Sequence, residues 1–469
     1  MKSFLIKNTR VVNEGKIFTA DVFIKNQRIE KIASNIQPQE NCTEINAENK
    51  FLIPGVIDDQ VHFREPGLTH KATIYTEAKA AVAGGVTSFM EMPNTKPPAL
   101  TQELLEEKYT IAQKTSLANY SFFMGASNDN FEEVMKTNTR KNDVCGVKIF
   151  MGSSTGNMLV DNTLVLDKVF AETELLIATH CEEESLIKAN LEKLKAAKSV
   201  LEPSDHPVIR NEEVCFQSSL KAIQLAKKNN TRLHILHIST EKELQLFTNL
   251  VPLKDKKITA EVCVHHLHFT ADDYATLGNL IKCNPAIKSS NNKTALWKAL
   301  LDGRLDVIAT DHAPHTLQEK GFIGNGETLV PLSFAEGLGV RYEQAPSGLP
   351  LVQHSLLLML HYVKQGSLSL EFLVEKMSHA VAECFQIKER GYIREGYFAD
   401  LVLVDMNKPT TVTKENILYK CGWSPLEKFT FPASITHTFV NGSMVYVTDD
   451  YGKPVFDESH FGQRLKFNR

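Results

Sequence analysis

Two histidines end apolar runs that have the composition of buried strands. His180 closes the run LLIATH, and His237 closes the run LHILH. A polar side chain at such a place is costly unless it is hydrogen-bonded or used, so either residue alone favours a structural histidine. Their equivalent positions in two successive units favour a shared role instead. Because imidazole is a common ligand of zinc, we predict that His180 and His237 bind a metal ion.

Lys148 stands in another apolar run, between Val147 and Ile149. Burial there would lower the pKa of the ammonium group and leave a neutral amine. A neutral amine reacts with CO₂ to give a carbamate, whose two oxygens could bridge two metal ions. A buried lysine paired with a carboxylate is an equally good interpretation of the same pattern.

A third group of residues combines histidine with a carboxylate. Gln60 and His62 are two residues apart on an extended run, so their side chains point to the same side. Asp311 lies one residue after the apolar run VIA and precedes His312 and His315. A carboxylate there can take a proton from a metal-bound hydroxide and return it, which makes Asp311 a candidate general base and acid. A helix N-cap is the structural alternative. Histidine and carboxylate ligands favour Zn²⁺, although they also suit Fe or Mn.

The elements that must position these residues follow from the hydrophobic pattern. Between residues 54 and 388, short apolar runs alternate with amphipathic helical patterns, which is typical of a parallel sheet. Eight such runs predict an α/β protein with a (β/α)₈ TIM barrel, whose functional residues lie at the C-terminal ends of the strands. The predicted strands cover residues 55–62, 86–92, 119–125, 145–150, 175–180, 232–238, 257–263 and 305–311.

Both ends of the chain have a different pattern. Residues 3–53 alternate apolar and polar positions, and a similar pattern returns towards the C-terminus. We therefore expect a small β-sandwich domain built from residues 1–53 and 389–469, with the barrel in residues 54–388. Residues 319–345 contain several glycines and little periodicity, so a long surface loop or lid is expected there.

Composition excludes several classes of protein. The 469 residues are 42% hydrophobic with a net charge of −4, which is ordinary for a globular protein and gives no electrostatic footprint for nucleic acid. No apolar run approaches the length of a membrane span, and the N-terminal sequence is interrupted by Lys and Asn before it could form a signal peptide. The eight dispersed cysteines indicate reduced thiols. We expect a cytoplasmic protein that binds a small molecule and neither nucleic acid nor membrane.

Taken in order, several motifs resemble one known family. They are IPGVIDDQVHFREPGLTHK, FMEMPNTKPP, GVKIFMGSSTG, ATHCEEES, HILHIST, KCNPAIK, ATDHAPHT, APSGLP, CGWSPLEKF and VNGSMVY. The chain is similar over essentially its whole length to the dihydroorotases, cyclic amidohydrolases of the amidohydrolase superfamily. The resemblance implies a zinc hydrolase of pyrimidine biosynthesis that interconverts N-carbamoyl-L-aspartate and L-dihydroorotate.

The resemblance also assigns roles to individual residues. It implies that His180 and His237 bind one metal ion, that carboxylated Lys148 bridges, and that His62 and Asp311 belong to a second ion. One or two zinc ions per chain are therefore expected, and a homodimer is compatible with the resemblance. The remaining residues would contact the substrate: its carboxylate is expected at Arg64 and Asn94, and its ring at Asn284, His315, Ser347 and Gly348.

One residue departs from the family pattern. The first strand of the family carries His-x-His, and Gln60 replaces the first histidine. An amide oxygen is a poor zinc ligand beside imidazole. Gln60 or a water molecule could complete that site, only the site of His180 and His237 could be filled, or the centre could be degraded. A hydantoinase or allantoinase is an alternative enzyme, against which Arg64 and Asn94 argue, and a catalytically silent scaffold for a partner enzyme is an alternative of another class.

Overall fold

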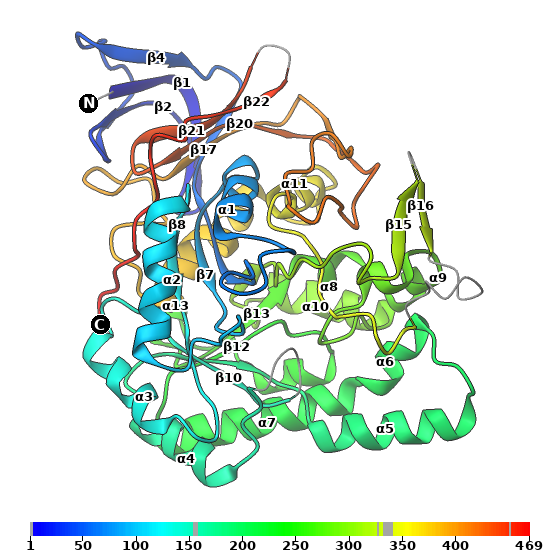
Figure 1. Cartoon of the computed structure of the whole chain (residues 1–469). Helices are drawn as coiled ribbons and strands as arrows, with labels where there is room; N and C mark the ends of the chain where they lie inside the picture. The colour runs from blue at the N-terminus through cyan, green and yellow to red at the C-terminus, as the bar shows by residue number, and fades with distance from the viewer. Residues whose placement is uncertain (1–2, 153–157, 326–327, 332–340, 450–451) are drawn as a thin grey trace.

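The structure is a computed structural model of the whole chain. It describes all residues except 1–2, 153–157, 326–327, 332–340 and 450–451. Figure 1 shows two parts: strands from the two ends of the chain lie side by side at the top, and helices surround a bundle of strands below them.

The lower part is a closed barrel of parallel strands. Each strand pairs in parallel with the next along the chain, and β8 and β9 continue one another on either side of Phe123. The barrel closes where Val61 pairs with His312 and the His62 amide donates to His312 O at 2.7 Å. All eight predicted strand positions are confirmed: β6 (Val56–Val61), β7 (Val86–Glu91), β8 (Asn119–Phe122) with β9 (Met124–Gly125), β10 (Val147–Phe150), β11 (Ile177–His180), β12 (Leu233–Ile235), β13 (Ile258–Cys263) and β14 (Val307–Ala309).

Helices connect these strands and cover the outside of the barrel (Figure 1). Helix α1 (Ile74–Ala83) illustrates their signals: Thr73 caps its N-terminus through Thr76, and Gly84 ends it. The others are α2 (Gln102–Thr115), α3 (Phe131–Lys136), α4 (Thr163–Glu172), α5 (Glu184–Ala197), α6 (His206–Ile209), α7 (Glu212–Asn229), α8 (Val264–His268), α9 (Tyr274–Leu277), α10 (Ser290–Leu301), α11 (Ser355–Lys364), α12 (Leu370–Val374) and α13 (Ala380–Phe385).

Apolar side chains fill the end of the barrel opposite to the predicted site. Ile57, Phe123 and Leu236 belong to this cluster, which also contains Phe385 of α13. The last residues of the chain return to the barrel and add Phe467 to the same cluster. This packing leaves the C-terminal ends of the strands as the place where polar side chains can meet.

The upper part is one nine-stranded sheet made from both ends of the chain. Its order is β22, β21, β20, β17, β5, β1, β2, β3, and β4 pairs with β1. The two ends meet where β5 and β17 run antiparallel. This confirms the β-domain built from both termini, while the boundaries at 53/54 and 388/389 stay predictions. Its strands are β1 (Ser3–Asn13), β2 (Lys16–Lys25), β3 (Arg28–Ala33), β4 (Cys42–Asn46), β5 (Phe51–Pro54), β17 (Leu401–Asp405), β20 (Ser434–Val440), β21 (Ser443–Thr448) and β22 (Pro454–Phe456).

Among the residues that the structure describes, two short pairs of strands lie outside these sheets. Strands β18 (Thr410–Thr411) and β19 (Thr430–Phe431) form one, and β15 (Phe322–Asn325) and β16 (Thr328–Pro331) form the other. The second pair falls within the loop expected at 319–345, so part of that segment is a hairpin. Residues 326–327 and 332–340 of the expected loop lie outside the described residues.

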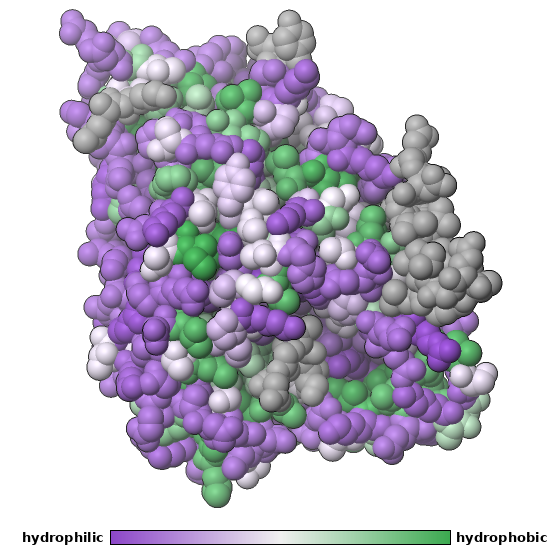
Figure 2. Space-filling view, viewed as in Figure 1, coloured by the Kyte–Doolittle hydropathy of each residue, from purple (hydrophilic) through white to green (hydrophobic). Residues whose placement is uncertain are grey.

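The surface and the thiols agree with a globular chain. Figure 2 shows hydrophilic residues over most of the visible face, with apolar residues in small separate patches. All eight cysteines carry free thiols. In the described ranges, no helix combines the length and the apolar character that a bilayer span requires.

Candidate active site

Most of the predicted site residues surround one small cavity. Its volume is about 20 Å³, roughly the space of one water molecule. Of the predicted residues, Asn94, His315 and Gly348 do not line it but contact residues that do, or lie directly behind them. The lining consists of Gln60, His62, Arg64, Lys148, Phe150, His180, His237, Asn284, Asp311, Ala313 and Ser347.

The two histidines at the ends of strands face one another. His180 Nδ1 lies 3.0 Å from His237 Nε2, and both rings are buried. His180 Nε2 faces the Glu182 carboxylate at 3.1 Å, and Glu182 also pairs with Arg210. Burial would raise the pKa of Glu182, but Arg210 and His180 lower it to about 2. The ionised Glu182 therefore orients His180 through Nε2 and leaves Nδ1 directed at His237.

Lys148 lies beside these histidines without a carboxylate partner among the described residues. Its Nζ is buried and makes no hydrogen bond there, and it stands 4.6 Å from the centre of the Phe150 ring. Burial lowers the pKa of Lys148 to about 7, against the opposing charge of Asp311. The interpretation as a buried ion pair is therefore not supported, and a neutral amine is available at moderate pH.

Asp311 is held by the two residues of the first strand. Gln60 Nε2 donates to Asp311 Oδ1 at 3.1 Å, and His62 Nε2 lies 3.1 Å from the same oxygen. On its other side, His62 Nδ1 is 2.7 Å from Asn94 Oδ1. The amide oxygen of Gln60 lies 3.8 Å from Cys263 Sγ. Gln60 thus directs its amide nitrogen at Asp311 and His62. This nitrogen is a hydrogen-bond donor and cannot bind a metal ion, unlike the histidine that the family pattern has at this position.

Arg64 is a buried cation without an anionic partner. It is 3% exposed and forms no ion pair with any described residue. Its Nε donates to Pro314 O at 3.1 Å, and its Nη2 lies 3.0 Å from His315 Nε2. Lys71 Nζ lies 2.9 Å from the other ring nitrogen of His315 and pairs with Glu319. Burial lowers the pKa of Arg64 to about 10, which still leaves it charged at neutral pH.

Asn284 and Ser347 line the cavity, and Gly348 lies behind Ala313. Asn284 Oδ1 lies 3.1 Å from His206 Nε2, and Ser347 O lies 3.0 Å from His315 Nε2. Gly348 has φ +143, and a Cβ there would lie 2.4 Å from Ala313 O. Only glycine therefore fits at position 348.

Three of the predicted residues have a left-handed backbone, which is uncommon outside glycine. They are Arg64 with φ +68, His237 with φ +41 and Asp311 with φ +48. Such conformations cost of order 1–3 kcal/mol and gather at functional sites. Residues that line this cavity are therefore held in unfavourable backbone conformations, as is typical of a functional site.

The pattern that defines the Amidohydrolase family matches residues 51–445. The chain belongs to the amidohydrolase family. The dihydroorotase of Pyrococcus abyssi is 31% identical over 94% of both chains, and that of Bacillus cytotoxicus is 30% identical over 95% of this chain and 98% of its own. Among solved structures, the L-hydantoinase (dihydropyrimidinase) of Arthrobacter aurescens is 26% identical, covers 99% of this chain and 100% of its own, and has a TM-score of 0.87. The resemblance inferred from the motifs is confirmed.

The residues of this amidohydrolase fit a metal ion at His180 and His237. Two ring nitrogens converge at 3.0 Å, and the other nitrogen of His180 faces a carboxylate, as in many metal-binding histidines. Lys148 Nζ and His237 Nδ1 are buried without hydrogen-bond partners within the described structure. Neutral imidazole nitrogens such as these are ligands that zinc accepts.

Sequence reasoning missed some residues of this amidohydrolase site. Glu182 orients His180, Lys71 contacts His315, and Cys263 contacts Gln60. His265 is also buried, and neither of its ring nitrogens has a hydrogen-bond partner in the described ranges. The signal for His265 was its place two residues after the seventh strand. Glu182 stands among other glutamates in ATHCEEES, and no local pattern distinguishes it.

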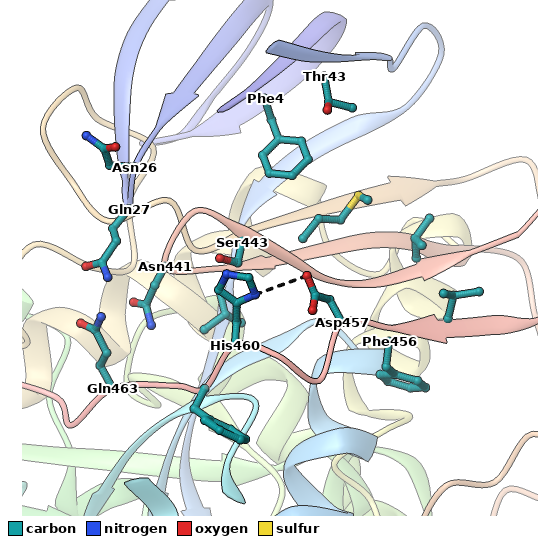
Figure 3. Close-up of a pocket in the computed structure, with 15 residues that line it drawn as sticks. Phe4, Asn26, Gln27, Thr43, Asn441, Ser443, Phe456, Asp457, His460 and Gln463 are labelled. Carbon is teal, nitrogen blue, oxygen red and sulfur yellow. Dashed lines mark ion pairs between the residues drawn. The ribbon is translucent and has the colours of Figure 1, made fainter. Parts of the chain in front are cut away.

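A larger cavity of about 630 Å³ lies in the terminal sheet of this amidohydrolase (Figure 3). Figure 3 shows Phe4 and Phe456 on its walls and the ion pair of Asp457 and His460, which are 3.3 Å apart. None of the predicted site residues lines it. Size alone therefore does not locate the chemistry, which belongs with the small cavity at the strand ends.

Proposed function

We propose that this chain is a dihydroorotase, which interconverts L-dihydroorotate and N-carbamoyl-L-aspartate by opening and closing a cyclic amide. The observation that carries the proposal is Arg64, a buried cation that no described carboxylate neutralises, beside His180, His237 and Asp311. Both compounds carry a carboxylate, and a guanidinium binds a carboxylate through two parallel hydrogen bonds. The names of the Pyrococcus and Bacillus relatives support the same substrate.

His180, His237 and carboxylated Lys148 would hold a zinc ion. When bound, zinc supplies Lewis acidity and lowers the pKa of water. We propose one ion in this site, because Gln60 directs its amide nitrogen at Asp311 and so offers no ligand beside His62. The unpartnered Nζ of Lys148 supports carboxylation, since a neutral amine is what reacts with CO₂.

Asp311 is the proposed proton carrier. In ring opening, water adds to the amide carbon, Asp311 accepts a proton from that water and passes it to the ring nitrogen, and the carbon–nitrogen bond breaks. In ring closure the same proton moves in reverse. Gln60 and His62 hold the Oδ1 atom of Asp311 at 3.1 Å each, so the carboxylate has a fixed direction. Arg64 fixes the other end of the substrate through its carboxylate.

An assay with matched substrates tests the proposal. The purified chain, loaded with zinc and bicarbonate, is given L-dihydroorotate, N-carbamoyl-L-aspartate, hydantoin and dihydrouracil, which is the dihydroorotate ring without its carboxylate. We expect turnover of the first two. The kcat/KM for dihydroorotate should be at least about 100-fold above that for dihydrouracil, because a buried charge pair between Arg64 and the carboxylate contributes roughly 3 kcal/mol. A chain that turns over none of the four is catalytically silent, and the proposal is then wrong.

A hydantoinase is the second candidate. The TM-score of 0.87 with the Arthrobacter aurescens L-hydantoinase favours it. Hydantoin and dihydrouracil carry no carboxylate, so they would leave Arg64 buried and unneutralised. A preference for either compound over dihydroorotate in the assay would establish this second activity.

A further inference from the structure

A second polar cluster lies inside the barrel, on the side of the active site that faces α13. Asp59 of β6, His234 of β12 and Glu261 of β13 are fully buried. Their candidate ligand atoms all lie within 4.8 Å of one another. His234 Nε2 is 3.1 Å from Asp59 Oδ2 and 3.7 Å from Glu261 Oε2, and the His234 ring packs against Phe385. None of the three residues lines the active-site cavity, and the proposed reaction does not use them.

The described residues balance the charge of this cluster only in part. Burial lowers the pKa of His234, but Asp59 and Glu261 raise it to about 9, so one positive charge faces two carboxylates. Within the described structure, the ion pairs of Asp59 and Glu261 lead only to His234. Both oxygens of Asp59 and Oε2 of Glu261 are buried without a hydrogen-bond donor there. Because burying a carboxylate oxygen without a hydrogen bond is unfavourable, these three oxygens need compensation. One imidazole N–H can donate to only one of them.

Neighbouring groups fix the direction of two members of the cluster. The Thr259 hydroxyl donates to Leu233 O at 3.3 Å and lies 2.7 Å from His234 Nδ1, so it accepts the proton of that nitrogen. When a cation replaces the proton on Nε2, the lone pair of that nitrogen faces the same ion as both carboxylates. A histidine that binds a metal has this arrangement, with its other N–H held by an acceptor. Glu261 Oε1 accepts from the His237 amide at 3.0 Å, which leaves Oε2 directed at His234.

We propose that Asp59, His234 and Glu261 form a further cation site, which binds a divalent transition metal such as Zn²⁺. One nitrogen and two carboxylate donors at this spacing match the ligands of a three-residue zinc site. A charge of +2 neutralises the two carboxylates, and one ion contacts all three residues at once. Calcium and magnesium prefer six or more oxygen ligands, so the nitrogen donor and the small ligand set favour zinc. This site does not depend on the proposed function.

Anomalous diffraction tests the proposal on crystals of the full chain grown with zinc chloride. Data collected above and below the zinc absorption edge should show a peak about 2.0–2.1 Å from His234 Nε2. This peak is separate from any peak beside His180 and His237. Asp59→Asn should remove it and lower the zinc content by one equivalent per chain. The matched control is Asp58→Asn, because Asp58 is also buried but is bound by the Thr310 hydroxyl at 2.7 Å, and this variant should keep the peak.

Two results would overturn the proposal. One is a wild-type map that has no peak beside His234, whether or not zinc lies beside His180. The other is an Asp59→Asn chain whose map and zinc content equal those of the wild type. The wild-type map decides the question even if a variant fails to fold. Because turnover is not a readout, a peak in a chain without dihydroorotase activity still supports the cation site.

Discussion

Replacing Arg64 by methionine tests whether this residue selects the substrate. The change removes the guanidinium and keeps most of the aliphatic length of the side chain. In the structure the guanidinium contacts two neutral groups, Pro314 O at 3.1 Å and His315 Nε2 at 3.0 Å. The substitution therefore leaves no buried charge behind, and we expect the chain to fold.

The expected loss follows from the burial of Arg64. Removing one partner of a buried charge pair costs about 2–5 kcal/mol. Arg64 is 3% exposed and its charge has no partner among the described residues, so its pairing with a substrate carboxylate is well shielded from water. A value of about 3 kcal/mol lowers kcat/KM for dihydroorotate roughly 100-fold. Dihydrouracil lacks the carboxylate, so its kcat/KM should fall by less than about threefold.

The assay compares both substrates in the wild type, Arg64→Met and a charge control. Lys71→Met is the control, because Lys71 approaches the opposite edge of His315 but its charge is paired with Glu319 at 2.9 Å. We expect the control to lose less than about tenfold for dihydroorotate. Equal losses for dihydroorotate and dihydrouracil in Arg64→Met would refute the role of Arg64 in carboxylate binding. They would also remove the main argument against a hydantoinase.

Three further substitutions test the rest of the site. Asp311→Asn should lower turnover about 10²–10⁴-fold with an unchanged circular dichroism spectrum, and activity near the wild-type value would exclude Asp311 as proton carrier. Gln60→His replaces an amide N–H donor by a lone pair, so zinc should appear beside His62 in an anomalous map; an unchanged map would mean that this pair cannot hold an ion. Lys148→Met tests the pKa of Lys148, which burial lowers from 10.5 to about 7. Between these two pKa values the unfolded state binds the proton more tightly than the folded state. The free energy of unfolding of the metal-free wild type should therefore rise, relative to the variant, by up to about 1.4 kcal/mol per pH unit. Urea unfolding from pH 7 to 10 measures this, and a constant difference would contradict the shift.

The barrel could be predicted because its strands are buried on both faces. Strands such as β10 and β11 have no exposed residue, so each is a largely apolar run in the sequence. Lys148 and His180 interrupt these runs, and an interruption that burial makes costly is visible without any structure. The apolar runs therefore predicted the fold, and the polar residues within them predicted the first ligand candidates.

Contacts between distant parts of the chain could not be predicted in this way. His315 lies between Arg64 and Lys71, and Glu182 lies between His180 and Arg210, but the spacing of these residues gives no sign of contact. The cluster of Asp59, His234 and Glu261 is similarly hidden, because its members stand on three different strands. Side-chain direction inside a closed barrel decides these contacts, and the hydrophobic period does not specify it across strands.

Gln60 shows how a substitution that looks like a loss in the sequence has a different meaning in the structure. Its amide nitrogen holds Asp311 at 3.1 Å, and its amide oxygen lies 3.8 Å from Cys263 Sγ. The same sulfur lies 3.2 Å from Glu261 Oε1, so Gln60 and Cys263 stand between the proposed proton carrier and the buried cluster. The residue that removes a metal ligand from the active site therefore fixes the direction of the Asp311 carboxylate and fills the space between it and the deeper carboxylates.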